Sequence, residues 1–411
     1  KKIFLTQKKQ WEASFVNTPA ATAAASHIAG CAAADLISKK YPNYDITLVE
    51  KSSFLGAGNK THYYGGHPYT FGPRHFLTQD EPVYEYLNEI LPIRLCPEHQ
   101  FITYVSQDSN FYNFPINEDD IPLMPDKDKI YSELKKLNDI SSALDFEEYW
   151  IASVGKSLYE KFVLNYNKKM WRIDSNKEFD TFKWSPKGIA LKKGPRAAWD
   201  VAISGYPYDP KGYDPYFEIA TQNIEVFLNT TISIFDIPSK RVFFNGEWHS
   251  YEIIINTISP SDIFENIYGE LPFVGRDLIK FVLPSEYVFP KDVYFIYFAG
   301  QEPFTRLVEY KRFTHHKSPH SLIGMEIPSL NGKHYPLPMK HWQGIADKYH
   351  NLQPENVFSI GRAGSYRYEV DIDDSIEQSL EIDQIVKKNS YDGPLPIKKW
   401  CVFKIISPYL Y

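Results

Sequence analysis

The sequence predicts an α/β protein with a Rossmann-like nucleotide domain, and two stretches carry this prediction. Near the N-terminus, a run typical of a helix at 28–37 precedes a run typical of a strand at 44–50, which ends in an acidic residue. Near the C-terminus, a short apolar run at 357–360 leads into Gly361 and then into a helical pattern at 373–380. Strands that alternate with helices in this way are typical of a parallel sheet covered by helices.

The N-terminal stretch has the spacing of a dinucleotide-binding loop but lacks two of its glycines. Glu50 lies 20 residues after Gly30, the separation expected between the last loop glycine and the carboxylate that binds a ribose. If Gly30 is the third glycine of G-x-G-x-x-G, Ala25 and His27 hold the first two positions, where a Cβ crowds the turn. A helix after a degenerate turn explains the same residues, and no glycine loop directly follows the candidate first strand at 2–5.

The C-terminal stretch from Gly361 to Ile372 combines a glycine turn, an arginine and two tyrosines. A strand, a turn and a helix N-terminus form an anion site, because free N–H groups and the helix dipole point at the ligand. Arg362 adds a guanidinium that can hold a phosphate through two hydrogen bonds. Tyr366 and Tyr368 lie two apart, so in an extended segment their phenols share one side. A glycine turn with surface tyrosines explains this pattern equally well.

Composition bounds the class of function. The 411 residues suffice for two or three domains, and the 43% hydrophobic and 23% charged content is that of an ordinary soluble globular protein. A formal charge of −6, without a Lys/Arg cluster interleaved with aromatics, argues against nucleic-acid binding. Cys31, Cys96 and Cys401 lack metal-ligand spacing, which predicts no metal site and favours reduced thiols in the cytoplasm. No apolar run reaches about 18 residues, so no membrane span is expected.

Several motifs, in order along the chain, resemble those of the UDP-galactopyranose mutase family. The most specific is 303–313, which matches P-Y-T-R-x-x-E-x-K-x-F almost throughout. Residues 147–162 resemble E-x-x-I-S-x-V-G-x-x-L-Y-E-K-F, and the likeness continues to Trp171. Residues 114–117 repeat F-P-I-N, and 361–372 resemble G-R-x-x-x-Y-x-Y-x-D-M with one extra residue. The chain is identified on these residues as a diverged member of the family.

Other motifs match with departures. Residues 50–59 resemble E-K-x-x-x-x-G-G-N with one insertion, and 334–338 resemble P-Y-Y-P-V. In 71–78, which resembles Y-G-P-H-I-F-H-T, Arg74 and Leu77 replace the two family histidines, and His75 is offset by one residue.

A further departure concerns the substrate diphosphate. The family patterns I-P-V-R and Y-Q-G-I-P correspond here to 185–188 and 203–207, which lack the arginine and the tyrosine that bind the diphosphate in the family. Lys187, Lys192 and Arg196 are candidate replacements, although a lysine is a point charge rather than a fork.

The resemblance implies an FAD-binding Rossmann-like domain with a helical insert and an antiparallel β-sheet domain. The expected parts of the FAD-binding domain are 1–78, 223–262 and, together with a C-terminal tail, 345–411. The others are a mainly helical insert that forms the substrate wall at 79–180, a connection to the substrate site at 181–222 and the antiparallel sheet domain at 263–344.

The resemblance also implies an isomerase that interconverts the pyranose and furanose forms of a UDP-galactose-like sugar. In the family, N5 of reduced FAD attacks the anomeric carbon, the nucleoside diphosphate leaves and returns, and there is no net redox change. The expected partner is a nucleotide sugar, and homo-oligomerisation stays open. Expected cofactor contacts are Gly30, Glu50, Lys51, Gly56, Asn59, Gly72, Gly361, Arg362, Asp371 and Ile372. Expected substrate contacts are Asn117, Trp171, Arg306, Tyr335, Tyr366 and Tyr368.

Two arginines are expected to act in catalysis. Arg306 corresponds to a diphosphate clamp, and Arg74 is a cation that would favour electron density on a reduced flavin. Two alternatives remain. The lost arginine and tyrosine suggest a relative that acts on another nucleotide sugar. Ala25, His27 and Arg74 suggest a non-catalytic binding or structural protein that kept the fold without FAD.

Overall fold

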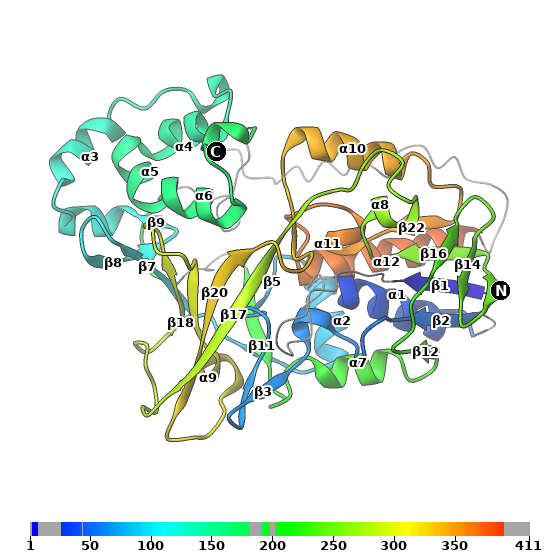
Figure 1. Ribbon diagram of the computed structural model, residues 1–411. Coiled ribbons are helices and arrows are strands. Elements are labelled where there is room, and N and C mark those ends of the chain that lie inside the picture. Colours follow the sequence, from blue (N-terminus) through cyan, green and yellow to red (C-terminus); the bar gives the residue numbers. More distant parts are fainter. Residues whose placement is uncertain (1, 7–25, 43, 181–190, 198–201, 390–411) are drawn as a thin grey trace.

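A parallel five-stranded sheet forms the centre of the nucleotide domain in the computed structural model, with strand order β12-β2-β1-β16-β22 (Figure 1). All neighbouring strands in it run parallel, which confirms the Rossmann-like prediction. The strands are β1 (Lys2–Thr6), β2 (Asp45–Val49), β12 (Glu225–Phe227), β16 (Ile253–Asn256) and β22 (Val357–Ser359). The structure describes residues 2–6, 26–42, 44–180, 191–197 and 202–389.

The two faces of this sheet are covered differently, because side chains alternate along each strand. Leu48 and Ile255 belong to the main core together with residues of helix α1, whereas Val49 and Ile254 pack against a small antiparallel sheet, β13-β14-β15. Helix α12 lies against α1. The bounds are α1 (Ser26–Lys40), α12 (Ile372–Asn389), β13 (Ile234–Asp236), β14 (Arg241–Phe244) and β15 (Glu247–Ser250).

A second sheet of seven strands has the order β21-β17-β20-β19-β18-β7-β8. Its neighbouring strands are antiparallel except β7 and β18, which run parallel. Two of its strands, β7 and β8, come from the segment that was expected to be mainly helical. The bounds are β7 (Gln100–Val105), β8 (Asn110–Phe114), β17 (Phe273–Leu283), β18 (Val293–Phe298), β19 (Arg306–Glu309), β20 (Ser321–Ser329) and β21 (Tyr335–Pro336).

Four helices form a lobe beside the end of this sheet (Figure 1). Within 79–180, the segment expected to be mainly helical, residues 135–145 form no α-helix, and Leu137, Ile140 and Leu144 are exposed there. There the chain makes only a single 3₁₀ turn, which the side chain of Asp139 caps. The helices are α3 (Lys127–Leu134), α4 (Phe146–Val154), α5 (Lys156–Phe162) and α6 (Leu164–Trp171).

A small antiparallel sheet, β5-β11-β6, joins the nucleotide domain to the seven-stranded sheet. Its central strand needs Gly205, because a Cβ there would lie 2.5 Å from Cγ2 of Ile93 and 2.9 Å from the carbonyl oxygen of Arg94. These strands are β5 (Phe76–Thr78), β6 (Ile93–Leu95) and β11 (Ile203–Pro207). The elements around them include β3 (His62–Tyr64), β4 (His67–Tyr69), α2 (Glu81–Ile90), α7 (Asp214–Ala220), α9 (Tyr310–Thr314), α10 (Lys340–His350) and α11 (Gly361–Gly364).

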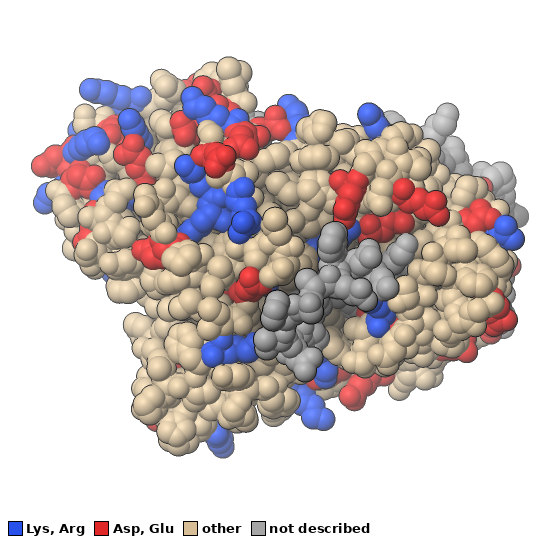
Figure 2. All heavy atoms as spheres, in the orientation of Figure 1, with Lys and Arg blue, Asp and Glu red and all other residues tan. Residues whose placement is uncertain are grey.

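The visible surface carries no large field of one sign. Lysine, arginine, aspartate and glutamate are interspersed on the face drawn in Figure 2, in keeping with the formal charge of −6. Among the described residues, none of the helices has both the length and the apolar character that a membrane span requires.

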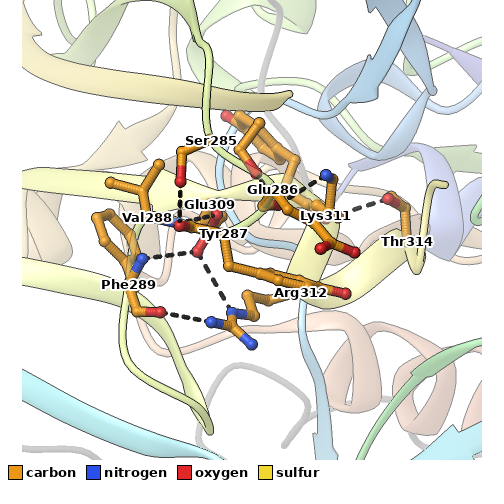
Figure 3. Close-up of polar contacts among 11 residues, drawn as sticks. Ser285, Glu286, Tyr287, Val288, Phe289, Glu309, Lys311, Arg312 and Thr314 are labelled. Atoms are coloured by element: carbon orange, nitrogen blue, oxygen red, sulfur yellow. Dashed lines mark hydrogen bonds and ion pairs between the residues drawn. The ribbon is translucent and has the colours of Figure 1, made fainter. Parts of the chain in front are cut away.

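Glu309, where β19 passes into α9, is a buried charge that ties a loop to the second sheet. Glu309 is 0% exposed. Its carboxylate accepts hydrogen bonds from the backbone N–H groups of Val288 (2.7 Å) and Phe289 (2.9 Å), and it pairs with Arg312 (3.3 Å; Figure 3). Lys311 is buried as well and donates to backbone carbonyl oxygens of the same region. Both charges therefore support the sheet.

Replacement of Glu309 should destabilise the protein. Glu309→Ala leaves two buried N–H groups and the Arg312 guanidinium without their acceptor, so we expect the free energy of unfolding to fall by about 3 kcal/mol in urea denaturation. Glu286→Ala is the matched control, because that side chain is exposed and its hydrogen bond to Lys311 comes from the backbone carbonyl, which the substitution keeps; we expect a change below about 0.5 kcal/mol. Equal midpoints for the two variants would contradict this account.

Candidate functional site

One face of the seven-stranded sheet presents a row of polar side chains. The register pairs Leu278 with Glu326, Glu326 with Arg306 and Arg306 with Tyr297. Residues directly opposite one another in an antiparallel sheet share a face, so these side chains stand next to each other. Arg276 lies two residues before Leu278 and points to the same face. Strand alternation alone thus brings two arginines and a carboxylate together.

Tyr335, on the edge strand β21, lies between two domains. The guanidinium carbon of Arg276, from the sheet, is 4.8 Å from the centre of its ring, and that of Arg362, from the nucleotide domain, is 5.4 Å away. Burial raises the pKa of Tyr335, but Arg276 and Arg306 more than offset this, so the pKa lies below that of an ordinary tyrosine. This phenol is therefore surrounded by positive charge.

A fourth arginine, Arg74, lies close to Arg306. A Cβ on Gly72 would lie 3.7 Å from Nη2 of Arg74 and 3.8 Å from Nη2 of Arg306, so the two guanidinium groups flank this glycine. The φ angle of Gly72 is +93°, a conformation that favours glycine. We call Arg74, Arg276, Arg306 and Arg362 the arginine cluster.

Two members of the arginine cluster have carboxylate partners. Arg306 binds Glu326 through two hydrogen bonds, from Nε (3.1 Å) and Nη2 (2.6 Å). Burial lowers the pKa of Arg306, but Glu326 and nearby phenols raise it well above the ordinary value. Arg362 pairs with Asp371 and donates from Nε to the carbonyl oxygen of Val370 (2.8 Å).

The other two members have no carboxylate partner among the residues that the structure describes. Arg276 is 8% exposed and donates only to the carbonyl oxygen of Gly275 (2.9 Å) and the sulfur of Met170 (3.0 Å). Arg74 donates from Nε to the carbonyl oxygen of Gly58 (3.1 Å), and burial lowers its pKa. An uncompensated buried guanidinium costs several kcal/mol, and an anionic ligand removes that cost. The arginine cluster therefore offers two positive charges to an anion.

Aromatic side chains enclose the arginine cluster where the helical lobe meets the sheet. The ring centre of Trp171, at the end of α6, lies 4.8 Å from that of Tyr368, and Tyr368 lies 5.7 Å from Tyr335. Tyr166, one turn earlier in α6, lies 5.5 Å from Tyr297. Trp171 is 2% exposed, and its indole N–H has no partner within the described part of the chain. The structure therefore brings Trp171, Tyr335, Tyr368 and Arg306 close together.

The carboxyl ends of the parallel strands provide residues that fit a dinucleotide cofactor. Glu50 follows β2 and is 2% exposed, which suits a carboxylate that binds a ribose. Asn59 is completely buried, yet neither atom of its amide has a partner within the described ranges. Gly56 precedes it with φ +99°, and a Cβ there would lie 2.5 Å from the Phe217 ring. The buried amide with free hydrogen-bonding capacity is the feature that a bound cofactor would explain.

The predicted tyrosine pair is wrong in its geometry. The chain forms the short helix α11 after β22 instead of an extended segment, and Tyr366 has a left-handed φ of +50°. Its hydroxyl donates to the carbonyl oxygen of Pro272 (2.6 Å), away from Tyr368, and its ring is completely buried. Tyr366 therefore has an internal partner and supports the segment that carries Arg362.

The predicted anion site at Gly361 also has internal partners. The N–H of Gly361 donates to the side chain of Gln378 in α12 (2.7 Å). The long helix begins only at Ile372, which is buried, and Asp371 pairs with Arg362 just before it. This turn is thus held by its own side chains, and Arg362 is the part of it that reaches Tyr335.

The remaining predicted residues include some with internal contacts and two that the structure does not describe. Asn117 accepts a hydrogen bond from the N–H of Asp119 (2.9 Å) and caps a 3₁₀ helix at 118–123. Gly30 lies within α1, where a Cβ would be 3.6 Å from Thr257, an ordinary contact. Lys51 is half-buried beside Glu50. Ala25 and Lys187 lie outside the described residues.

Reasoning from the sequence missed Arg276 and Glu326, two central residues of the site. Both lie in strands where polar and apolar residues mix, so neither stands out as a motif. The available signal was the period of two along 273–283 and 321–329, which places a charged residue on the same face as Arg306 in each strand.

This chain resembles known nucleotide-sugar mutases in sequence. The family model described as UDP-galactopyranose mutase matches residues 161–368, and that of an NAD(P)-binding Rossmann-like domain matches 26–90. A "Probable UDP-galactopyranose mutase" from Klebsiella pneumoniae is 24% identical over 383 residues, which cover 86% of this chain and 92% of that protein. A dTDP-fucopyranose mutase from Escherichia coli is 24% identical over 402 residues, with 89% and 97% covered.

The fold has a match among solved structures. The crystal structure of a reduced UDP-galactopyranose mutase superimposes with a TM-score of 0.74 over 95% of this chain and 94% of that chain, at 14% identity. At this level of identity the likeness establishes the fold. It extends over the nucleotide domain, the helical lobe and the seven-stranded sheet together.

The buried His334 predicts a specific pH dependence of stability. Burial, with Arg74 and Arg276 nearby, lowers its pKa from 6.5 to about 3. The folded state therefore binds fewer protons than the unfolded state between these values. Above pH 6.5 His334 is neutral in both states and the free energy of unfolding does not depend on it. Below pH 6.5 the free energy of unfolding falls by up to about 1.4 kcal/mol for each pH unit.

A comparison of variants tests this dependence. In urea denaturation between pH 6.5 and 5, we expect the wild type to lose about 2 kcal/mol more stability than His334→Phe. His341→Phe, at an exposed histidine, should leave the pH dependence of the wild type unchanged. Parallel pH profiles for the wild type and His334→Phe would contradict the assignment.

Proposed function

Because the chain belongs to the UDP-galactopyranose mutase family, and is therefore an isomerase of a flavoprotein family, we propose that it interconverts the pyranose and furanose forms of a UDP-galactose-like nucleotide sugar with FAD as cofactor. The observation that supports this most is the charge of the arginine cluster. Four guanidinium groups face only two carboxylates in the described part of the chain. A diphosphate carries the negative charge that this excess requires.

The geometry supports a division of labour between the arginines. Arg276 is the strongest candidate to bind the substrate diphosphate, because it is buried, faces Tyr335 and has only neutral partners within the described ranges. Two nitrogens of Arg306, Nε and Nη2, donate hydrogen bonds to Glu326, so the position of this guanidinium is set before a ligand arrives. Tyr335 and Tyr368 are the proposed phenol donors to the phosphate oxygens. This set would hold the leaving diphosphate close to the sugar so that it can return.

Other residues are proposed to hold the cofactor. Glu50 would bind the ribose, Asn59 would use its free amide on the cofactor, and Arg362 and Asp371 would line the turn next to it. When bound, the reduced FAD would supply the nucleophile for the anomeric carbon. Arg74 is proposed to stand beside it as a cation, where a positive charge favours negative charge on the reduced form.

Trp171 and Tyr166 of α6 are proposed to close the site against water. Both are buried, and their rings contact Tyr368 and Tyr297, which lie beside the arginine cluster. An enclosed site strengthens the attraction between the guanidinium groups and the diphosphate, because fewer water molecules screen the charges. The helical lobe would thus form one wall of the substrate site, as the resemblance implied.

A different nucleotide sugar is the second candidate. One similar protein is a dTDP-fucopyranose mutase, and Ile203 stands where the family pattern has a tyrosine. Ile203 lies in β11 and is half-buried, so an apolar side chain occupies a place where the family has a phenol. This favours a sugar or a diphosphate contact that differs from that of UDP-galactopyranose. The non-catalytic alternative would show itself as a protein that binds neither FAD nor a nucleoside diphosphate.

The proposal predicts how Arg276 affects nucleotide affinity. Arg276→Met keeps the length of the side chain but removes its charge, so we expect UDP to bind at least about 30-fold more weakly in isothermal titration calorimetry. Arg241→Met is the matched control, because Arg241 is exposed and pairs with Asp236 on the small sheet; it should leave the affinity unchanged. If UDP bound Arg276→Met as tightly as the wild type, the diphosphate site would have to lie elsewhere.

A further inference from the structure

Arg74 adopts a backbone conformation that the surrounding structure must enforce. Its φ is +45°, in the left-handed region that residues other than glycine rarely occupy, at a cost of about 1–3 kcal/mol. Two contacts hold it directly. Its Nε donates to the carbonyl oxygen of Gly58 (3.1 Å), and its own carbonyl oxygen accepts a hydrogen bond from the hydroxyl of Tyr213 (2.8 Å). Such strain persists where neighbouring contacts over-determine the conformation, and it is concentrated at functional sites.

The next residue, His75, is tied into a chain of hydrogen bonds that the proposed function does not use. Its Nε2 lies 2.9 Å from Oγ of Ser204 in β11, and its Nδ1 lies 3.2 Å from Nδ1 of His99. Ser204 in turn donates to the carbonyl oxygen of Cys96 (3.0 Å). Three separate segments of the chain therefore meet at His75.

The direction of every proton in this chain follows from one constraint. A carbonyl oxygen only accepts, so the single proton of the Ser204 hydroxyl goes to Cys96. Ser204 Oγ must then accept from Nε2–H of His75, which leaves Nδ1 of His75 as an acceptor for Nδ1–H of His99. Both rings are neutral in this arrangement. Burial, together with the charge of Arg94 for His75, lowers the pKa of His75 to about 3 and that of His99 well below its ordinary value, in agreement.

The packing around His99 fixes the far end of this hydrogen-bond chain. His99 is 1% exposed, and its ring stacks on Tyr294 with 4.3 Å between the centres. Phe101, Phe295 and Phe313 surround the same ring at 4.7–6.0 Å. In such a close-packed box the imidazole cannot rotate without displacing several aromatic rings. His99 thus presents its N–H in one direction, toward His75.

We propose that the chain Ser204–His75–His99 is a positioning device that holds Arg74 in its left-handed conformation, with its guanidinium beside Gly72 and Arg306. The inference rests on the proposed role of Arg74 as a cation beside the reduced flavin. The two imidazoles and the hydroxyl contact no member of the arginine cluster through a hydrogen bond that the structure shows. They act through the backbone of residues 74 and 75, on which the aim of the Arg74 side chain depends.

The test measures the midpoint potential of FAD bound to the full chain. Arg74→Ala should weaken the binding of reduced relative to oxidised FAD about tenfold, which lowers the two-electron potential by about 30 mV. Ser204→Ala and His75→Phe should shift the potential in the same direction, by about threefold in relative affinity. Ser204→Thr keeps the hydroxyl and should restore the potential of the wild type. In an Arg74→Ala background, Ser204→Ala should add no further shift.

The outcomes separate the inference from the proposed function. Suppose that Arg74→Ala shifts the potential but Ser204→Ala and His75→Phe only lower the melting temperature. The hydrogen-bond chain then has a structural role alone and the inference is wrong, while the role of Arg74 stands. An unchanged potential in Arg74→Ala would overturn both. UDP titration of the same variants, without added FAD, serves as a control: because Arg276 and Arg306 are the proposed ligands of the diphosphate, Ser204→Ala should leave the UDP affinity unchanged. A loss of UDP affinity in Ser204→Ala would mean that the substitution disturbs the whole arginine cluster, and would count against a role confined to Arg74.

Discussion

The excess of positive charge around Tyr335 is the constraint on which the rest of the structure depends. Two carboxylates, Glu326 and Asp371, each bind one arginine and fix its direction, while Arg74 and Arg276 remain without a carboxylate among the described residues. A buried guanidinium in this state destabilises the protein unless an anion joins it. The site is therefore incomplete by itself and is well suited to a ligand that brings its own negative charge.

The architecture explains how such a site is assembled. Arg276 and Arg306 come from the seven-stranded sheet, Arg362 from the turn after β22, and Arg74 from the connection between β4 and β5. Each arginine is anchored in a different packed element, and buried contacts such as those of Glu309 stiffen the sheet. The repulsion between the arginines is thus resisted by the cores of both sheets.

Much of the fold could be predicted from the sequence, but less of the site could. The strand before Gly361, the helix after it and the strand just before Glu50 have strong local patterns, and the structure confirms them. Arg276 and Glu326 were missed because their importance depends on register between strands distant in sequence, which no local pattern reveals. Tyr366 was misjudged because a short helix and a left-handed residue replace the extended backbone that its spacing suggested.

The most direct test of the account is a product analysis under controlled redox state. The protein is loaded with FAD, reduced with dithionite and incubated with UDP-galactopyranose or dTDP-fucopyranose, and the sugar is followed by NMR. The account predicts that a furanose form of at least one sugar appears with the reduced protein and not with the oxidised protein, and that the flavin is still reduced at the end. Binding of FAD and nucleotide without any furanose product from either sugar would contradict it.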